Sequence, residues 1–537
     1  MRIEKMPERE SGRARRHSNH FHFFALLFLL LFALPPALSA QTLEERLKEI
    51  DAYAAKAGQE WKVPGFSVAI VKDDKVVFVK GYGVRELGKA EPVDKDTLFA
   101  VASNTKAFTA AALATLVDEG KLKWDDPVTK YLPGFQLYDP YVTREMTVRD
   151  LLSHRSGLAT FGGDLLWYET TYPRAEIIHR IRYLKPVYGF RSRYGYQNIM
   201  FLAAGEIVPA VTGKNWDEYV REKFFAPLGM TRSNTTFKQL TAAENVAAPH
   251  NEVEGKVRVV HYSNVDAAGG AAVINSSAAE MAEWVRLQLG RGTYQGKKLF
   301  SADRSREMWT PHTVVSGVGE SAERFNPSVH FNLYGLGWGL SDYRGRKVVT
   351  HSGGLDGMTS RVALLPEENL GVVILTNSET PLQGFLWYKV FDVFTGAPAR
   401  DWSADYMARV RAAREREEAE AKKVEAARVA NTKPSLPLSA YAGTYGGVMY
   451  GDAKVTEENG RLVVRLVPSP NYVGDLEHWH FDTFRIKWRD SVVYPYPRGW
   501  VTFVLDPQGK ISEMKIDVPN PDFDFKELEF KRAADSK

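Results

Sequence analysis

A serine and a lysine three residues apart, Ser103 and Lys106, stand at the start of a segment rich in alanine and leucine. The strand-like residues 97–102 precede them, and the apolar residues 107–117 predict a buried helix. Both side chains then lie on one face of its first turn. A serine hydroxyl needs a neighbouring base to become a nucleophile, and a buried lysine with a lowered pKa can serve as that base. The pattern also fits a capped helix with a solvated lysine.

A second motif, Tyr196-Gln197-Asn198, begins 93 residues after Ser103. A tyrosine beside a lysine can exist partly as phenolate, so Tyr196 is a candidate base for the Ser103 proton. We expect Asn198 to hold Lys106 or a substrate amide by hydrogen bonds. Taken alone, the tripeptide also fits a core tyrosine at the start of an aromatic helix.

A third motif, His351-Ser352-Gly353-Gly354, begins 155 residues after Tyr196 on a predicted strand. The two glycines permit close backbone approach, so the N–H of Gly354 can pair with that of Ser103 as an oxyanion hole. Ser352 and Gly353 are candidate substrate-binding residues. A single His-Ser-Gly fits a turn at a strand end, but three such motifs in this order make a chance arrangement improbable.

Together these motifs resemble those of the class C β-lactamase and penicillin-binding serine hydrolase family: S-x-x-K, Y-x-N and H-x-G. Similar supporting segments lie at residues 151–158, 227–230 and 334–339, and the resemblance covers roughly residues 42–395. It implies an acyl-enzyme formed by Ser103, with Lys106 and Tyr196 moving the proton and no cofactor. Asn198 and His351 complete the implied catalytic set.

One position departs from the family pattern. Many β-lactamases of the family carry lysine where this chain has His351, and a permanent ammonium suits a substrate carboxylate better than a mostly neutral histidine does. Relatives with histidine there include esterases and D-amino-acid peptidases. We therefore expect a D-amino-acid peptidase, carboxypeptidase-like or esterase activity. A true β-lactamase and a silent cell-wall interaction protein are the alternatives. Trp167 and Tyr168 are candidate walls of the substrate pocket.

The order of elements predicts the fold. Strands at residues 66–71 and 76–79 form a hairpin, a mainly helical middle follows, and strands return between residues 347 and 375. This order predicts an α/β (α+β) fold of the β-lactamase/transpeptidase type, in which both chain ends close one antiparallel sheet beside a helical subdomain. The predicted divisions are a signal peptide at 1–40, a hydrolase domain at 41–400, a charged helical linker at 401–433 and a β domain at 434–537.

The last hundred residues are rich in Val, Tyr, Phe and Trp and predict a small antiparallel barrel or sandwich. They resemble the lipocalin-like β domain often fused to such hydrolases. His478 and His480 alternate on a predicted strand, with Glu477 beside them, but a zinc site needs three or four convergent ligands. The sequence supplies no evident third ligand, so we expect no metal site.

The N-terminus predicts export. Arg13, Arg15 and Arg16 precede twelve apolar residues and the small residues at 37–40, which predict a secretory signal cleaved after Ser39 or after Ala40, with Ala40 favoured. An uncleaved anchor is the alternative, although the apolar run is shorter than a membrane span needs.

The chain contains no cysteine and carries a formal charge of +4, of which residues 1–40 supply +3. A nearly neutral mature chain argues against nucleic acid as a partner. We expect a periplasmic or secreted protein that acts on a small-molecule or peptide substrate, with peptidoglycan peptides among the candidates.

Overall fold

The computed structural model describes residues 41–253, 255–315, 325–490, 499–520 and 522–534. The predicted signal peptide lies outside this part of the chain. No helix within the described ranges is both long and apolar enough to cross a membrane.

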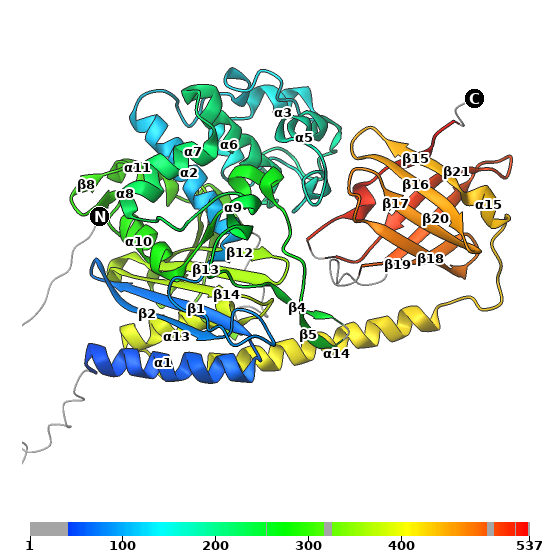
Figure 1. The fold of residues 1–537 in the computed structure, drawn as a ribbon. Helices are drawn as coiled ribbons and strands as arrows, with labels where there is room; N and C mark the ends of the chain where they lie inside the picture. Colours follow the sequence, from blue (N-terminus) through cyan, green and yellow to red (C-terminus); the bar gives the residue numbers. More distant parts are fainter. Residues whose placement is uncertain (1–40, 254, 316–324, 491–498, 521, 535–537) are drawn as a thin grey trace, which may run out of the picture. The chain divides into compact units, whose positions relative to one another are not determined.

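An eight-stranded antiparallel sheet forms the centre of the hydrolase region (Figure 1). The hairpin predicted near the N-terminus is confirmed, and its first strand pairs with the last strand of the sheet, so the two ends of the region close one sheet as predicted. In spatial order the strands are β2 (Lys75–Gly83), β1 (Gly65–Lys72), β14 (Leu370–Thr376), β13 (Met358–Leu365), β12 (Arg346–Leu355), β11 (Gly339–Tyr343), β10 (Asn332–Tyr334) and β9 (Thr313–Val314).

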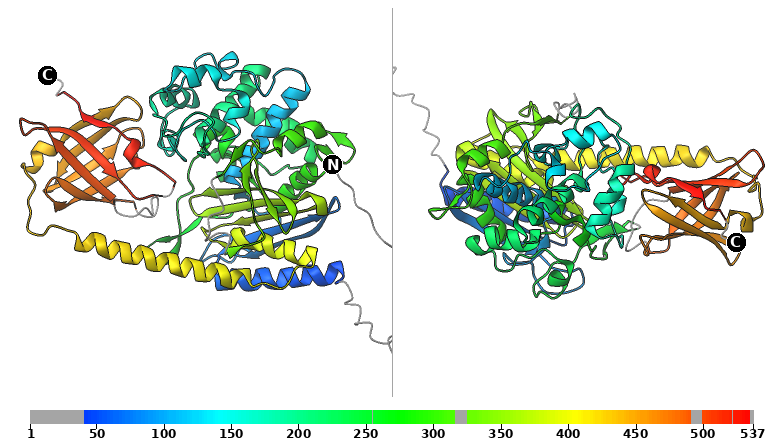
Figure 2. Two further views of the ribbon diagram at one scale, coloured as in Figure 1. Left: turned by 180° about the vertical axis from the view of Figure 1, so that it is seen from behind. Right: turned by 90° about the horizontal axis from the view of Figure 1, so that it is seen from above.

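Helices cover both faces of this sheet (Figures 1 and 2). Strand β14 is buried along its whole length, which explains its continuous apolar run, since helix α10 packs on one face and α13 on the other. The α-helices of the described ranges, including α15 beside the barrel, are α1 (Leu43–Glu60), α2 (Thr105–Asp118), α3 (Pro140–Glu145), α4 (Val148–Leu151), α5 (Arg174–Arg180), α6 (Asn198–Thr212), α7 (Trp216–Val220), α8 (Ala226–Leu228), α9 (Phe237–Thr241), α10 (Ala278–Leu289), α11 (Ala302–Met308), α13 (Leu382–Thr395), α14 (Trp402–Ala426) and α15 (Leu438–Tyr441).

Three short two-stranded sheets lie in the segment between β2 and β9. They pair β3 (Phe99–Ala100) with β6 (Asn275–Ser276), β4 (His250–Val253) with β5 (Lys256–Val259), and β7 (Thr293–Tyr294) with β8 (Lys297–Lys298). The first of these sheets matters for chemistry, because β3 leads directly to Ser103.

The predicted charged linker is mostly a single helix, α14. Its first turn is anchored, since Trp402 is fully buried, donates its indole N–H to Asp392 at 2.8 Å and stacks on Tyr388. Beyond the first turns the helix exposes most of its residues.

The C-terminal region is a closed eight-stranded antiparallel barrel, which confirms the predicted β fold and selects the barrel over the sandwich. Its interior is filled by alternating apolar side chains, for example Leu462, Val464 and Leu466 of one strand. The strands are β15 (Gly443–Gly447), β16 (Gly451–Glu458), β17 (Arg461–Leu466), β18 (Val473–His480), β19 (Thr483–Trp488), β20 (Gly499–Leu505), β21 (Ile511–Asp517) and β22 (Phe530–Arg532).

Candidate active site

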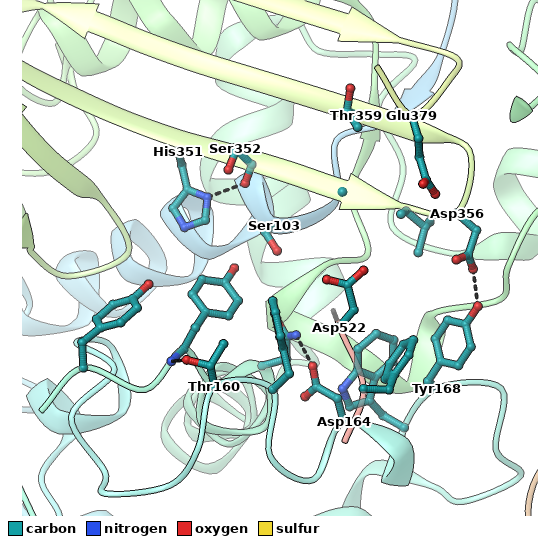
Figure 3. Close-up of a pocket in the computed structure, with 18 of the residues that line it drawn as sticks. Ser103, Thr160, Asp164, Tyr168, His351, Ser352, Asp356, Thr359, Glu379 and Asp522 are labelled. Atoms are coloured by element: carbon teal, nitrogen blue, oxygen red, sulfur yellow. Dashed lines mark hydrogen bonds between the residues drawn. The ribbon is translucent and has the colours of Figure 1, made fainter. Parts of the chain in front are cut away.

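Ser103 lies in a tight turn rather than at the end of a long strand. The strand expected over residues 97–102 is only the two-residue β3, and a 3-10 turn, Ala102–Asn104, carries the chain into α2. Ala102 has φ +46°, a left-handed conformation that a residue with a Cβ adopts at an energetic cost. This backbone bend is what lifts Ser103 out of the helix and into the pocket (Figure 3).

Strand β13 holds this turn in place. Ser360 donates its hydroxyl to the Val101 carbonyl at 2.8 Å and accepts the Asn104 amide, also at 2.8 Å. Ser360 is fully buried, so neither bond competes with water. The turn that carries Ser103 is thereby fixed to the sheet rather than to a loop.

Lys106 is fully buried beside Ser103. Its Nζ lies 3.0 Å from Ser103 Oγ, 2.6 Å from Asn198 Oδ1 and 3.0 Å from the Ala271 carbonyl oxygen. Burial lowers the pKa of Lys106 to about 7, with the charge of Asp164 opposing that shift. A neutral amine has two N–H donors and one lone pair. The two carbonyl-type oxygens accept the donors, which directs the lone pair at the Ser103 hydroxyl.

Tyr196 lies against the same lysine, with Lys106 Nζ 4.8 Å from its ring centroid. Burial raises the pKa of Tyr196 well above its ordinary value, although a hydrogen bond with Ser103 opposes the rise. The partial phenolate expected from the sequence is therefore wrong, because desolvation of the phenolate dominates over the neighbouring lysine. Tyr196 is therefore a neutral hydroxyl, and Lys106 is the more readily deprotonated of the two groups.

Asn198, the first residue of α6, bridges Lys106 to a buried acid. Its Oδ1 accepts from the lysine, and its Nδ2 donates to Asp164 Oδ2 at 2.6 Å. Asp164 begins a short 3-10 helix, Asp164–Leu166, that ends at Trp167, and burial raises the pKa of Asp164 to about 7. The sequence analysis missed Asp164, since nothing in its spacing links it to Asn198.

His351 is buried on β12 and makes two hydrogen bonds. Its Nδ1 lies 2.6 Å from the Ser352 carbonyl oxygen, so that nitrogen carries the proton, and Nε2 accepts from the Tyr334 hydroxyl at 2.9 Å. Burial, together with the nearby Lys106, lowers the pKa of His351 to about 3. The ring is therefore neutral at physiological pH. The sequence analysis expected a mostly neutral histidine at this position, where many β-lactamases of the family carry lysine.

The two glycines of the third motif have different surroundings. A Cβ on Gly353 would lie 2.2 Å from the Val101 carbonyl oxygen and 2.4 Å from Ser360 Oγ, so only glycine fits there. A Cβ on Gly354 would meet nothing within 4 Å, and Gly354 lines the pocket together with Ser103. Gly353 lets β12 lie close to the turn that carries Ser103, and Gly354 borders the cavity beside Ser103.

These residues border a cavity of about 610 Å³ (Figure 3). Trp167 and Tyr168 line it as predicted from the sequence, although both are buried and the Tyr168 hydroxyl donates to Asp356. Ser352 also lines the cavity, whereas Gly353 acts through its packing against the nucleophile turn.

The charged side chains that line the cavity in the described part of the chain are all acidic: Asp164, Asp356, Glu379 and Asp522. Burial raises the pKa of each of these carboxyl groups, and that of Glu379 reaches about 6. Figure 3 shows Asp356, Glu379 and Asp522 together on one side of Ser103, with His351 on the other. The sequence analysis missed these acids as well, because they come from segments far apart in the chain.

The histidines considered as metal ligands lie elsewhere, on β18. His478 Nε2 lies 2.9 Å from the Phe481 carbonyl oxygen, and a bulge separates the register of His478 from that of His480. Among the residues that the structure describes, no group of three or more His, Cys, Asp or Glu side chains is placed to hold a metal ion.

The sequence profile of the family described as Beta-lactamase matches residues 50–392. The chain belongs to the β-lactamase family. A second profile, described as a domain of unknown function (DUF3471), matches residues 427–532, which include the barrel. The family assignment and the site geometry together make this a serine-hydrolase-like member of the β-lactamase family.

Similar curated proteins include the unguisins hydrolase ungD' of Aspergillus campestris, which is 31% identical over 332 residues. That alignment covers 60% of this chain and 59% of the relative, so the chain spans less than two thirds of that protein's length. Protein flp of Staphylococcus aureus is 27% identical over 338 residues, covering 62% of this chain and 63% of flp.

Solved structures share the fold at low identity. The octameric penicillin-binding protein homologue from Pyrococcus abyssi superposes with a TM-score of 0.58 at 21% identity, covering 90% of this chain and all of that one. The D-amino acid amidase from Ochrobactrum anthropi SV3 gives 0.52 at 21% identity over 65% of this chain and 99% of that one. These likenesses confirm the predicted fold class.

Proposed function

We propose that this protein is an exported serine hydrolase that cleaves amide bonds in D-amino-acid amides or peptides bearing a free ammonium group. One observation carries the choice of substrate. The described residues that line the cavity include four acids and no lysine or arginine, and His351 is neutral. Such a cavity favours a cationic substrate and disfavours the carboxylate that β-lactams and C-terminal D-alanine peptides carry.

The names of relatives and neighbours support the same choice. An unguisins hydrolase is among the curated relatives, and a D-amino acid amidase and a D-stereospecific amidohydrolase are among the structural neighbours. We extend D-stereoselectivity to this chain as part of the proposal. The acidic cavity favours an amidase or aminopeptidase activity over the carboxypeptidase-like activity considered in the sequence analysis.

The mechanism follows from the contacts of Lys106. Its lone pair accepts the Ser103 hydroxyl proton as Oγ attacks the substrate carbonyl, and the N–H groups of Ser103 and Gly354 stabilise the oxyanion. The neutral Tyr196 hydroxyl passes a proton to the leaving amine and is reprotonated from Lys106. Water then attacks the acyl-enzyme by the same route, which releases the acid and restores Ser103.

A substrate panel tests the proposal. D-phenylalanine amide, its N-acetylated form, its L-enantiomer and benzylpenicillin are incubated with the protein from Gln41 onward, and product is measured by mass spectrometry. We expect hydrolysis of the D-amide, with kcat/KM at least tenfold lower after acetylation, since the charge that meets the acids is lost. Faster turnover of benzylpenicillin, or of the acetylated amide, would refute the amine-binding assignment.

The acids themselves supply the matched control. Glu379→Gln removes a charge and keeps the shape, so we expect a higher KM for the D-amide and an unchanged rate with p-nitrophenyl acetate, which has no charge to recognise. Equal losses on both substrates would show that Glu379 supports the fold and not the substrate.

Export is proposed from residues 1–40, where a basic segment precedes an apolar run and small residues. N-terminal sequencing of protein recovered from the periplasm or medium tests it. We expect a first residue of Gln41, and an intact N-terminus in the cell membrane would contradict cleavage.

A further inference from the structure

Asp164 belongs to none of the three sequence motifs of the site, yet it is hydrogen-bonded to Asn198 of the second motif. It is 1% exposed, and its Oδ2 accepts from Asn198 Nδ2 at 2.6 Å. Its other oxygen makes no hydrogen bond of good geometry among the described residues, although the Trp167 indole N–H lies near enough to lower its pKa. A buried carboxylate with so few donors is costly, and its position beside Asn198 gives it a use.

The amide of Asn198 can take two orientations of the same shape. In one, the oxygen faces Lys106; in the other, the NH₂ group does, and it would compete with the lysine donors. An ionised carboxylate can only accept, so Asp164, above its pKa of about 7, selects the orientation that places the Asn198 oxygen 2.6 Å from Lys106 Nζ. That choice fixes one lysine N–H, while Ala271 fixes the other, and the lone pair is left facing Ser103.

We propose that Asp164 is a positioning residue that orients Asn198 and, through it, sets the geometry and the charge of the lysine base. The proposal rests on the serine-hydrolase part of the proposed function and not on the amine-bearing substrate. It adds Asp164, from the 3-10 helix before α5, as a fourth polar residue beside Ser103, Lys106 and Asn198.

Other titratable groups surround this relay. His154 and His351 face Lys106, and burial lowers the pKa of both rings, so neither adds charge at neutral pH. Tyr196 stays protonated. Asp522 lies close enough to Asp164 to oppose its ionisation, and burial, together with the charge of Asp164, raises the pKa of Glu527 to about 8. Asp164 is the group whose charge raises the pKa of Lys106.

The rate at which a fluorophosphonate labels Ser103, measured from about pH 5 to pH 10, tests the proposal without knowledge of the substrate. Labelling needs neutral Lys106, so the rate falls as pH drops through the lysine pKa. Asp164→Asn keeps an oxygen that can accept from Asn198 but removes the charge that stabilises the ammonium. We expect its acid limb to move to lower pH by on the order of one unit, with a plateau within about threefold of wild type.

Asp164→Ala removes the acceptor as well, and we expect its plateau to fall by on the order of 10- to 100-fold, since the base is no longer held. Glu169→Gln is the matched control: Glu169 is a partly buried acid five residues away whose pKa burial also raises, and it should leave the profile unchanged. A profile for Asp164→Asn that superimposes on wild type would overturn the proposal.

A double variant, Asp164→Ala with Asn198→Ala, distinguishes a positioning role of Asp164 from a general loss of structure. If Asp164 acts through Asn198, adding Asp164→Ala to Asn198→Ala leaves the plateau rate within about twofold of the single variant. Multiplied losses would show that Asp164 supports the site by another path, and would also overturn the proposal. Wild-type protein that is never labelled would instead refute the proposed serine hydrolase.

Discussion

Replacing Gly353 by alanine gives a graded test of how the sheet holds the nucleophile. The new Cβ would lie 2.2 Å from the Val101 carbonyl oxygen and 2.4 Å from Ser360 Oγ. An ordinary carbon–oxygen contact is about 3.2 Å or longer, so β12 and the nucleophile turn must separate by about 1 Å. Overpacking of this kind costs about 1–3 kcal/mol.

The same displacement acts on the chemistry. Val101 lies two residues before Ser103, and Ser360 also holds Asn104, so the shift moves the nucleophile relative to Lys106. A 1 Å misplacement costs about 10²-fold in rate. We expect Gly353→Ala to lower the fluorophosphonate labelling rate by that order and to reduce the urea midpoint of unfolding.

Gly354→Ala is the control for this prediction. Its Cβ would meet nothing within 4 Å, so we expect the free energy of unfolding to stay within about 0.5 kcal/mol of wild type. Wild-type labelling and stability in Gly353→Ala would refute the packing argument, because they would mean that β12 does not fix the nucleophile turn.

Further predictions concern charge and anchoring. Hydrolysis of p-nitrophenyl acetate should rise with pH through the Lys106 pKa of about 7, since only the neutral amine accepts a proton; a rate independent of pH between about 5 and 9 would contradict this. His351→Lys should speed acylation by benzylpenicillin about tenfold or more, because a cation then faces the carboxylate of the drug. Adduct formation no faster than in wild type, measured by intact mass spectrometry, would contradict this prediction. Trp402→Ala should cost about 3–5 kcal/mol in urea unfolding, because it empties a buried site and removes the indole donor to Asp392 Oδ2, and a loss under about 1 kcal/mol would show that α14 is not anchored there.

Much of the fold was predictable from local patterns. The hairpin β1–β2 and the strands β12 to β14 have apolar runs bounded by turn residues, and α2 is apolar enough to be buried on all sides. The closing of one sheet by both ends of the hydrolase region followed from the order of strands, helices and strands. The strand before Ser103 was overestimated, because the positive φ of Ala102 ends it and no residue type there indicates such a bend.

The motif residues of the site could be found from spacing, and the residues that tune them could not. Asp164 lies 34 positions before Asn198, and Asp356 and Glu379 reach the cavity only because the sheet brings their segments together. The protonation state of Tyr196 was also out of reach. Proximity to Lys106 favours the phenolate and burial disfavours it, and only the structure shows that burial dominates.

The most direct test of the account is the intact mass of the protein after exposure to a fluorophosphonate, with wild type and Ser103→Ala side by side. The account predicts one adduct on wild type, mapped by proteolysis to Ser103, and none on the variant. An equal adduct on Ser103→Ala, or a modified residue elsewhere, would contradict the assignment of Ser103 as the nucleophile.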